Sequence, residues 1–80
     1  MNDAEIVKRI DDLVKEEHRL EREHADDGLS DADRDRLQAV EVQLDQCWDL
    51  LRQRRARRSA GQDPAEAQVR DPEVVEHYQQ

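Results

Sequence analysis

The chain is short of the apolar and aromatic side chains from which a small globular protein builds its core. Its 80 residues include no phenylalanine, one tryptophan and one tyrosine, and 35% of them are hydrophobic against 42% charged. A chain of this length forms one domain at most. Because so short and polar a chain rarely folds around an internal core alone, we expect it to associate with a partner.

Cysteine and long apolar runs are scarce as well. Cys47 is the single cysteine, so the sequence predicts no disulfide framework. The polar start, MNDAEIVKRIDD, does not resemble a signal peptide. No apolar run approaches the roughly 20 residues that cross a bilayer. We therefore expect a protein of the reducing cytoplasm without membrane contacts.

The residue patterns of enzymes are also missing. The sequence has no glycine-rich phosphate loop. Two long helices do not bring together a Ser/His/Asp or Cys/His catalytic arrangement. Long helices alone leave little volume for a substrate pocket. These absences predict a protein that is not an enzyme and that needs no cofactor.

Helical periodicity is what the sequence does contain. A first apolar stripe predicts a helix over about residues 3–25, and a second predicts a helix over about residues 31–59. The second stripe has the alternating spacing of a heptad seam. Gly28 suits the turn between the helices, and Gly61 suits the end of the second. The first stripe is Ile6, Ile10, Leu13 and Leu20; the second is Leu37, Val40, Leu44, Cys47 and Leu51.

A short turn at Asp26–Ser30 makes the two helices an antiparallel hairpin, so the predicted fold is all-α. Pairing the stripes about this turn sets apolar residues opposite one another, with one mismatch in which Glu17 faces Val40. The apolar layers are Ile6 with Leu51, Ile10 with Cys47, Leu13 with Leu44, and Leu20 with Leu37.

Further apolar residues lie outside this seam and have no partner within a hairpin. Burying each would contribute roughly 1.5–3 kcal/mol, so we expect two hairpins to form a homodimeric four-helix bundle. Trp48 would anchor that interface, and Cys47 would be an unreactive core thiol that could cross-link a dimer on oxidation. In an alternative monomer the C-terminal tail covers the strip. The predicted interface residues are Val7, Val14, Trp48 and Leu50.

Residues 61–80 differ in composition from the hairpin at residues 1–60. Asp63 before Pro64 resembles a helix cap followed by a first-turn proline, which indicates a short helix. Pro72 is expected to interrupt that helix. We expect a weakly structured tail, because few of its side chains are apolar.

A basic block at the end of the second helix stands between acidic segments. It has a charge of +5, against −9 for residues 1–51 and −4 for residues 59–80. Cations at a helix C-terminus suit the helix dipole, and we expect this block beside Asp3, Glu5 and the acidic tail. Binding to an acidic protein or a polyanion is the alternative. An acidic chain without an aromatic residue among the arginines is poorly suited to nucleic acid. The block is Arg52, Arg54, Arg55, Arg57 and Arg58.

One stretch could carry metal chemistry. The spacing of Glu21 and His24 matches carboxylate-bridged metal sites in helical bundles, and Glu17 falls on the same helical face. Glu41 is the facing glutamate at a suitable height. A solvated helix face with ion pairs four residues apart is the simpler interpretation.

The segments VEVQLDQCWDLLRQRRARR from Val40, IDDLVKEEHRL from Ile10 and GQDPAEAQVR from Gly61 together resemble a family of small actinobacterial proteins of unknown function. The resemblance spans nearly the whole chain, with Asp45–Arg55 as its most specific run. It implies a short helical cytoplasmic protein and supplies no activity. Glu16, Glu17 and His18 resemble the family's first-helix pattern, whereas His24 has no counterpart in it.

The sequence thus predicts a non-enzymatic interaction or accessory protein that self-associates. Two alternatives stay open at this point. The first is a small regulator that binds an acidic protein or nucleic acid through Arg52–Arg58. The second is a helical bundle that binds a metal through carboxylates and histidine.

Overall fold

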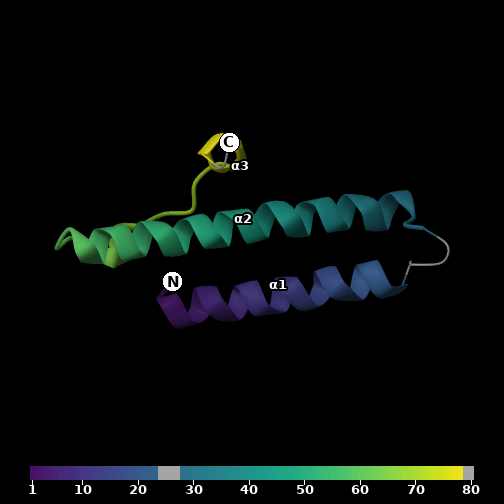
Figure 1. Cartoon of the computed structure of the whole chain (residues 1–80), viewed down its shortest axis with the longest axis horizontal. Coiled ribbons are helices and arrows are strands. Elements are labelled where there is room, and N and C mark those ends of the chain that lie inside the picture. Colours follow the sequence, from purple (N-terminus) through teal and green to yellow (C-terminus); the bar gives the residue numbers. More distant parts are fainter. Residues whose placement is uncertain (24–27, 79–80) are drawn as a thin grey trace.

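A computed structural model describes residues 1–23 and 28–78 (Figure 1). Helices α1 and α2 run antiparallel, and a short 3₁₀ helix, η1, and a third helix, α3, follow them. The described residues contain no strand, as the sequence predicts. The molecule is elongated, with principal extents of 51 × 25 × 16 Å. The elements are α1 (Asp3–Glu23), α2 (Asp31–Ser59), η1 (Pro64–Glu66) and α3 (Pro72–Tyr78).

Side-chain caps start both long helices. The Asn2 side chain accepts a hydrogen bond from the backbone N–H of Glu5 at 2.8 Å, and Glu5 accepts one from the N–H of Asn2 at 3.1 Å. This reciprocal pair is a capping box. At α2, Ser30 accepts from the backbone N–H of Asp33 at 3.1 Å, as its position before the helix predicts. The predicted end of the first helix lies outside the described residues.

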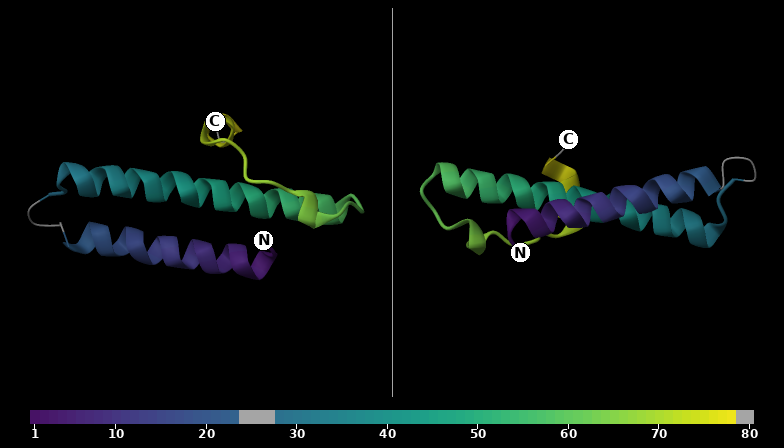
Figure 2. Two further views of the ribbon diagram at one scale, coloured as in Figure 1. Left: turned by 180° about the vertical axis from the view of Figure 1, so that it is seen from behind. Right: turned by 90° about the horizontal axis from the view of Figure 1, so that it is seen from below.

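A left-handed glycine ends α2. Gly61 has a φ of 74°, and its N–H donates to the carbonyl of Arg58 at 3.2 Å. The N–H of Gln62 donates to the carbonyl of Arg57 at 2.8 Å. These bonds satisfy carbonyls that the helix end would leave without partners, and the turn directs the tail back along α2 (Figure 2).

The predicted apolar stripes form the core between α1 and α2. Val40 is fully buried, although the sequence places it opposite the half-buried Glu17. Leu20 is buried nearer the turn. Removing such side chains from water is the main force that holds the hairpin together. The central cluster comprises Ile6, Ile10, Leu13, Val40, Leu44 and Leu50, with Val14, Cys47, Leu51 and Ala67 packed against it.

The structure corrects the sequence analysis at Leu50. This side chain was expected in an exposed strip, but it is 6% exposed and belongs to the core cluster. Ala67, from the tail, packs against the same cluster. Leu50 lies outside the heptad seam, on a side of α2 that Ala67 and Val69 of the returning tail approach. The spacing of the helices alone does not reveal that approach.

The tail forms a third layer on α2. Helix α3 lies on the side of α2 opposite α1, and its axis makes a steep angle with the axis of α2 (Figure 1). Its Val75 is 1% exposed. The predicted short helix after Asp63 is present as η1, with the Asp63 carboxylate accepting from the N–H of Ala65 at 2.9 Å. Pro72 does not interrupt a helix as expected; it occupies the first position of α3, where its missing N–H costs nothing.

The helices in the described part of the chain are too short or too polar to span a lipid bilayer.

Candidate functional site

A buried carboxylate on α2 holds the tail in place. Asp49 has no exposed surface, and it is the one charged side chain that is buried among residues 1–23 and 28–76. The Arg70 guanidinium donates two hydrogen bonds to its two oxygens, one of them 2.9 Å long. Gln53 donates a third at 2.9 Å. A planar guanidinium and a carboxylate match each other in this bidentate geometry.

Two glutamines on the same face of α2 bind the tail backbone. The Gln46 side chain donates to the carbonyl of Arg70 at 3.1 Å, and the Gln53 side chain donates to the carbonyl of Gln68 at 2.8 Å. Positions 46, 49 and 53 are three and four residues apart, so they lie on one helical face. We call Gln46, Asp49 and Gln53 the tail-binding face.

Electrostatics favour the charged form of Asp49 despite its burial. The hydrogen bonds from Arg70 lower the pKa of the Asp49 carboxyl below its ordinary value, and the one from Gln53 acts in the same direction. Burial opposes them, because removing a carboxylate from water raises its pKa. The net lowering of this pKa favours a charged Asp49 when the tail is docked on α2.

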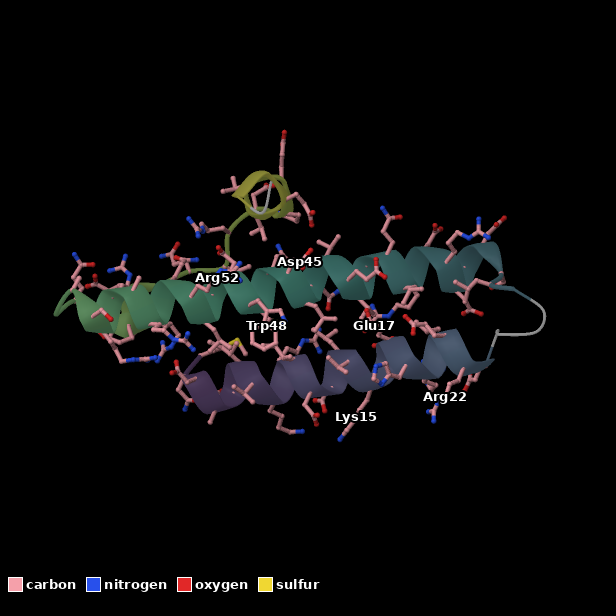
Figure 3. The ribbon with its side chains drawn as sticks, viewed as in Figure 1. Lys15, Glu17, Arg22, Asp45, Trp48 and Arg52 are labelled. Carbon is pink, nitrogen blue, oxygen red and sulfur yellow. The ribbon has the colours of Figure 1, made fainter. Side chains whose placement is uncertain are left out.

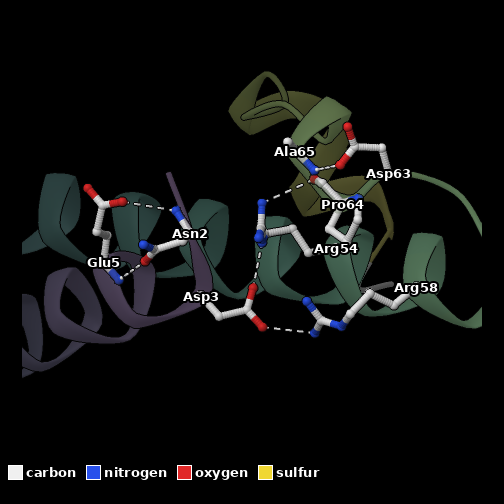
Figure 4. Close-up of polar contacts among 8 residues, drawn as sticks. All are labelled: Asn2, Asp3, Glu5, Arg54, Arg58, Asp63, Pro64 and Ala65. Carbon is white, nitrogen blue, oxygen red and sulfur yellow. Dashed lines mark hydrogen bonds and ion pairs between the residues drawn. The ribbon is translucent and has the colours of Figure 1, made fainter.

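The arginine block contacts the start of α1, as expected for a helix-end role (Figure 4). Arg54 donates to one oxygen of Asp3 at 2.5 Å, and Arg58 lies 2.8 Å from the other. These bonds lower the pKa of the Asp3 carboxyl. Arg54 also donates to the carbonyl of Pro64 at 3.1 Å, so it connects α1, α2 and η1.

The other members of the block have different surroundings. Arg57 pairs with Glu66 of the tail at 3.4 Å. Arg52 lies close enough to Asp49 to help lower its pKa. Arg55 is exposed and forms no ion pair with any described residue. Glu5, expected beside the arginines, instead completes the cap of α1. The acidic neighbours therefore neutralise part of the block.

One long edge of the hairpin remains apolar and uncovered. The opposite edge is closed by polar contacts: Arg9 donates to Gln43 at 2.8 Å, and Arg36 donates two bonds to Glu16, one at 2.7 Å. At about 100° per residue, Val7 and Val14 lie on the other side of α1 from Arg9. We call Val7, Val14 and Trp48 the apolar edge.

The members of the apolar edge differ in exposure. Val7 is 54% exposed and Trp48 is 47% exposed, whereas Val14 is half-buried and packs against the core. In Figure 3, Trp48 lies at the boundary between α2 and α1, whereas Asp45 and Arg52 lie on the side of α2 nearer α3. Trp48 and Val7 are thus two of the large apolar side chains that the described residues leave exposed.

Cys47 has the apolar surroundings that the sequence predicts. It is half-buried, packs against the core cluster and lines a small hollow with Leu50 and Val69. Burial raises the pKa of its thiol, although the charge of Arg9 acts weakly in the other direction. A raised thiol pKa lowers the thiolate fraction and hence the reactivity.

The candidate metal ligands do not come together in the described part of the chain. Glu21 and Glu41 are exposed, and Glu17 is half-buried on the hairpin seam. His24 lies outside the described residues. Among the described residues, no group of three or more histidine, cysteine, aspartate or glutamate side chains is arranged to hold a metal ion.

The tail-binding face is the feature that the sequence analysis missed. Asp49 lies outside both apolar stripes, and its environment depends on a segment about 20 residues away. One signal was available: Arg70 is the single basic residue among five acids in residues 59–80. Such an isolated arginine has a specific carboxylate partner in this fold.

Comparison with known proteins gives a family and no activity. A family described as a protein of unknown function, DUF2630, matches residues 2–80. Uncharacterized proteins Rv0898c of Mycobacterium tuberculosis and Mb0922c of Mycobacterium bovis are each 48% identical to the chain over 77 residues. These matches cover 95% of the chain and 88% of each relative. No solved structure matches. The expected resemblance to small actinobacterial proteins of unknown function is confirmed at that level.

Proposed function

The chain belongs to the DUF2630 family, whose function is unknown, and we propose that it is a non-enzymatic helical interaction protein that self-associates through its apolar edge. We place it in the cytoplasm, where a lone reduced thiol such as Cys47 is ordinary. The names of the relatives assign no activity, so the proposal is argued from the exposed side chains of the chain.

The exposure of Trp48 carries the proposal. About half of this large side chain meets water in a single chain, whereas the nearby Leu50 is buried in the core cluster. A second hairpin packed on the apolar edge would bury Trp48 and Val7 and complete a four-helix bundle. Because Val7 is already about half buried, its burial would contribute about half of the roughly 1.5–3 kcal/mol that complete burial of such a side chain provides. Tryptophan is among the residues most often found at the energetic centre of an interface.

The competing hypothesis, a regulator that binds an acidic partner through the arginine block, has less support. Asp3 already occupies Arg54 and Arg58, and Glu66 occupies Arg57. A partner would have to displace these internal acids. The metal-binding hypothesis also has less support, because its candidate glutamates do not converge among the described residues.

Light scattering across a hundredfold concentration range, with a reductant present, tests the proposal. The wild-type chain should have the mass of a dimer, and Trp48→Glu should convert it to a monomer because a charge at the buried centre of an interface is costly. Val74→Glu is the matched control, since Val74 is 49% exposed, close to the 47% of Trp48, and lies in α3, on the far side of α2 from α1 (Figure 1). It should remain dimeric.

Two results would contradict the proposal. One is a monomeric wild-type chain at every concentration. The other is a dimer whose mass is the same with tryptophan or glutamate at position 48. Far-ultraviolet circular dichroism of each variant would show that the helices persist, so that a lost dimer is not an unfolded chain.

A further inference from the structure

The tail-binding face selects little of the tail beyond its backbone and one side chain. Gln46 and Gln53 donate to main-chain carbonyls, which every residue possesses. The specific contact is the bidentate pair between Asp49 and Arg70. The chemistry that this face requires is therefore an extended segment that carries one correctly spaced arginine.

The arrangement resembles a peptide bound in a groove more than a continuous fold. The carbonyls of Gln68 and Arg70 are two residues apart, so an extended chain directs both toward one side. Because Gln53 contacts the earlier carbonyl and Gln46 the later one, the tail runs antiparallel to α2. Residues 67–71 belong to no helix, so these carbonyls are free to accept from α2.

We propose that Gln46, Asp49 and Gln53 also bind the tail of a second copy of this chain, whose Arg70 would complete the site in place of the chain's own. A second copy is the occupant that the contacts favour, because it reproduces every hydrogen bond seen within one chain. Another protein with an extended arginine segment would reproduce the polar contacts but not the burial of Val75 and Ala67.

The turn at Gly61 provides a pivot for such an exchange. A side chain built on Gly61 would meet no atom within 4 Å, so the chain around it is open to solvent. Opening this turn would break the cap hydrogen bonds from the N–H groups of Gly61 and Gln62, and exchange of an identical element about such a hinge is a low-cost route to dimers. The exchange would use the opposite side of α2 from the apolar edge, so it is independent of the dimer proposed above.

The chain's own tail competes with any tail from outside. A short tether gives it an effective concentration in the millimolar range. Weakening the internal contact at Arg70 should therefore open the site to an external tail. This difference allows the site to be tested with the full-length protein, without removing any segment.

The test uses a fluorescent peptide with the sequence of residues 60–80, titrated with full-length chain and followed by anisotropy. Full-length Arg70→Ala, which keeps Asp49 but lacks the competing arginine, should bind the peptide at least tenfold more tightly than the wild-type chain. Arg70→Ala combined with Asp49→Asn should bind at least tenfold more weakly than Arg70→Ala alone. A peptide with alanine in place of its arginine should lose the same factor.

The peptide variant guards against misfolding, because it uses the same Arg70→Ala protein. Equal binding of the two peptides would overturn the proposal, since the peptide arginine would then contribute nothing to binding at Asp49. No saturable binding to Arg70→Ala would also overturn it. Anisotropy reports peptide binding whatever the mass of the protein, so failure of the Trp48 experiment and failure of this one are distinguishable.

Discussion

The two faces of α2 are held to their neighbours by different kinds of contact. Toward α1, the face is apolar, and Leu44 and Val40 pack into a continuous core. Toward the tail, it is polar, and Asp49 and two glutamines hold the chain by directed hydrogen bonds. Apolar packing depends mainly on volume and periodicity, whereas the polar face depends on individual atoms. The apolar face can therefore be predicted from the sequence, whereas the contacts of the polar face are established by the structure.

The largest expected effect comes from the apolar face. Leu13→Ala removes a side chain that is 1% exposed and should lower the free energy of unfolding by about 2–5 kcal/mol, through lost burial and the cavity left behind. Urea denaturation followed by circular dichroism measures this change. Val74→Ala, at a 49% exposed position in α3 and outside the apolar edge, is the control and should cost under about 1 kcal/mol. Equal losses would mean that the core does not lie on the seam.

An intermediate effect is expected on the polar face. Asp49→Ala should lower the free energy of unfolding by about 1–3 kcal/mol, because three hydrogen bonds lose their acceptor. The loss should be local: amide hydrogen exchange should accelerate in residues 68–76 and change little in α1. Asp35→Asn, which neutralises an exposed carboxylate elsewhere on α2, should leave exchange in the tail unaltered. Uniform acceleration along the chain would contradict a separate tail-binding face.

Acid should weaken the polar face before it affects the apolar one. The pKa of Asp49 is lowered in the folded chain, so its contribution is complete above the unfolded pKa of about 4 and is lost as pH falls through the lower folded value. Unfolding free energies measured between pH 7 and pH 2.5 should therefore fall more steeply for the wild-type chain than for Arg70→Gln. Parallel curves would show that the pair is not linked to stability.

The carboxyl of Glu76 in the tail has the opposite effect: its protonation should raise the free energy of unfolding as pH falls. A hydrogen bond with Asp45 raises the pKa of Glu76, so the repulsion between these two groups is relieved as pH falls through that raised value. Glu76→Gln removes this opposing contribution. In its background the stabilising effect of mild acid should disappear, and the loss assigned to Asp49 should remain.

The smallest expected effect is at the arginine block. Arg54→Gln should cost up to about 1 kcal/mol, because its partner Asp3 is partly exposed and screened by solvent. Arg55→Gln, which removes the same charge from a position without an ion pair among the described residues, should change stability by less. The two variants would be compared in low and high salt. If salt changed the stability of both variants equally, the ion pair between Arg54 and Asp3 would contribute no more than the summed charge of the protein does.

The helices of the hairpin could be predicted from the sequence because their signals are local or periodic. The start and end of α2 follow from Ser30 and Gly61, and the core positions of Ile10 and Leu44 follow from spacing alone. Leu50 was misplaced, because its cover comes from a segment with little periodicity of its own. The site around Asp49 was missed for the same reason: no pattern in α2 distinguishes a carboxylate that meets an arginine from one that meets water.

The position of Arg70 has a consequence for proteolysis. It is the one lysine or arginine in residues 59–80, so the bond that follows it is the single place where trypsin could cut that segment. Trypsin must take the guanidinium into its own pocket, and Asp49 already holds it. Cleavage there can proceed only while the tail is undocked, and when docking is fast its rate reports the fraction of open molecules. The rate of tryptic cleavage after Arg70 therefore measures how often the tail leaves α2.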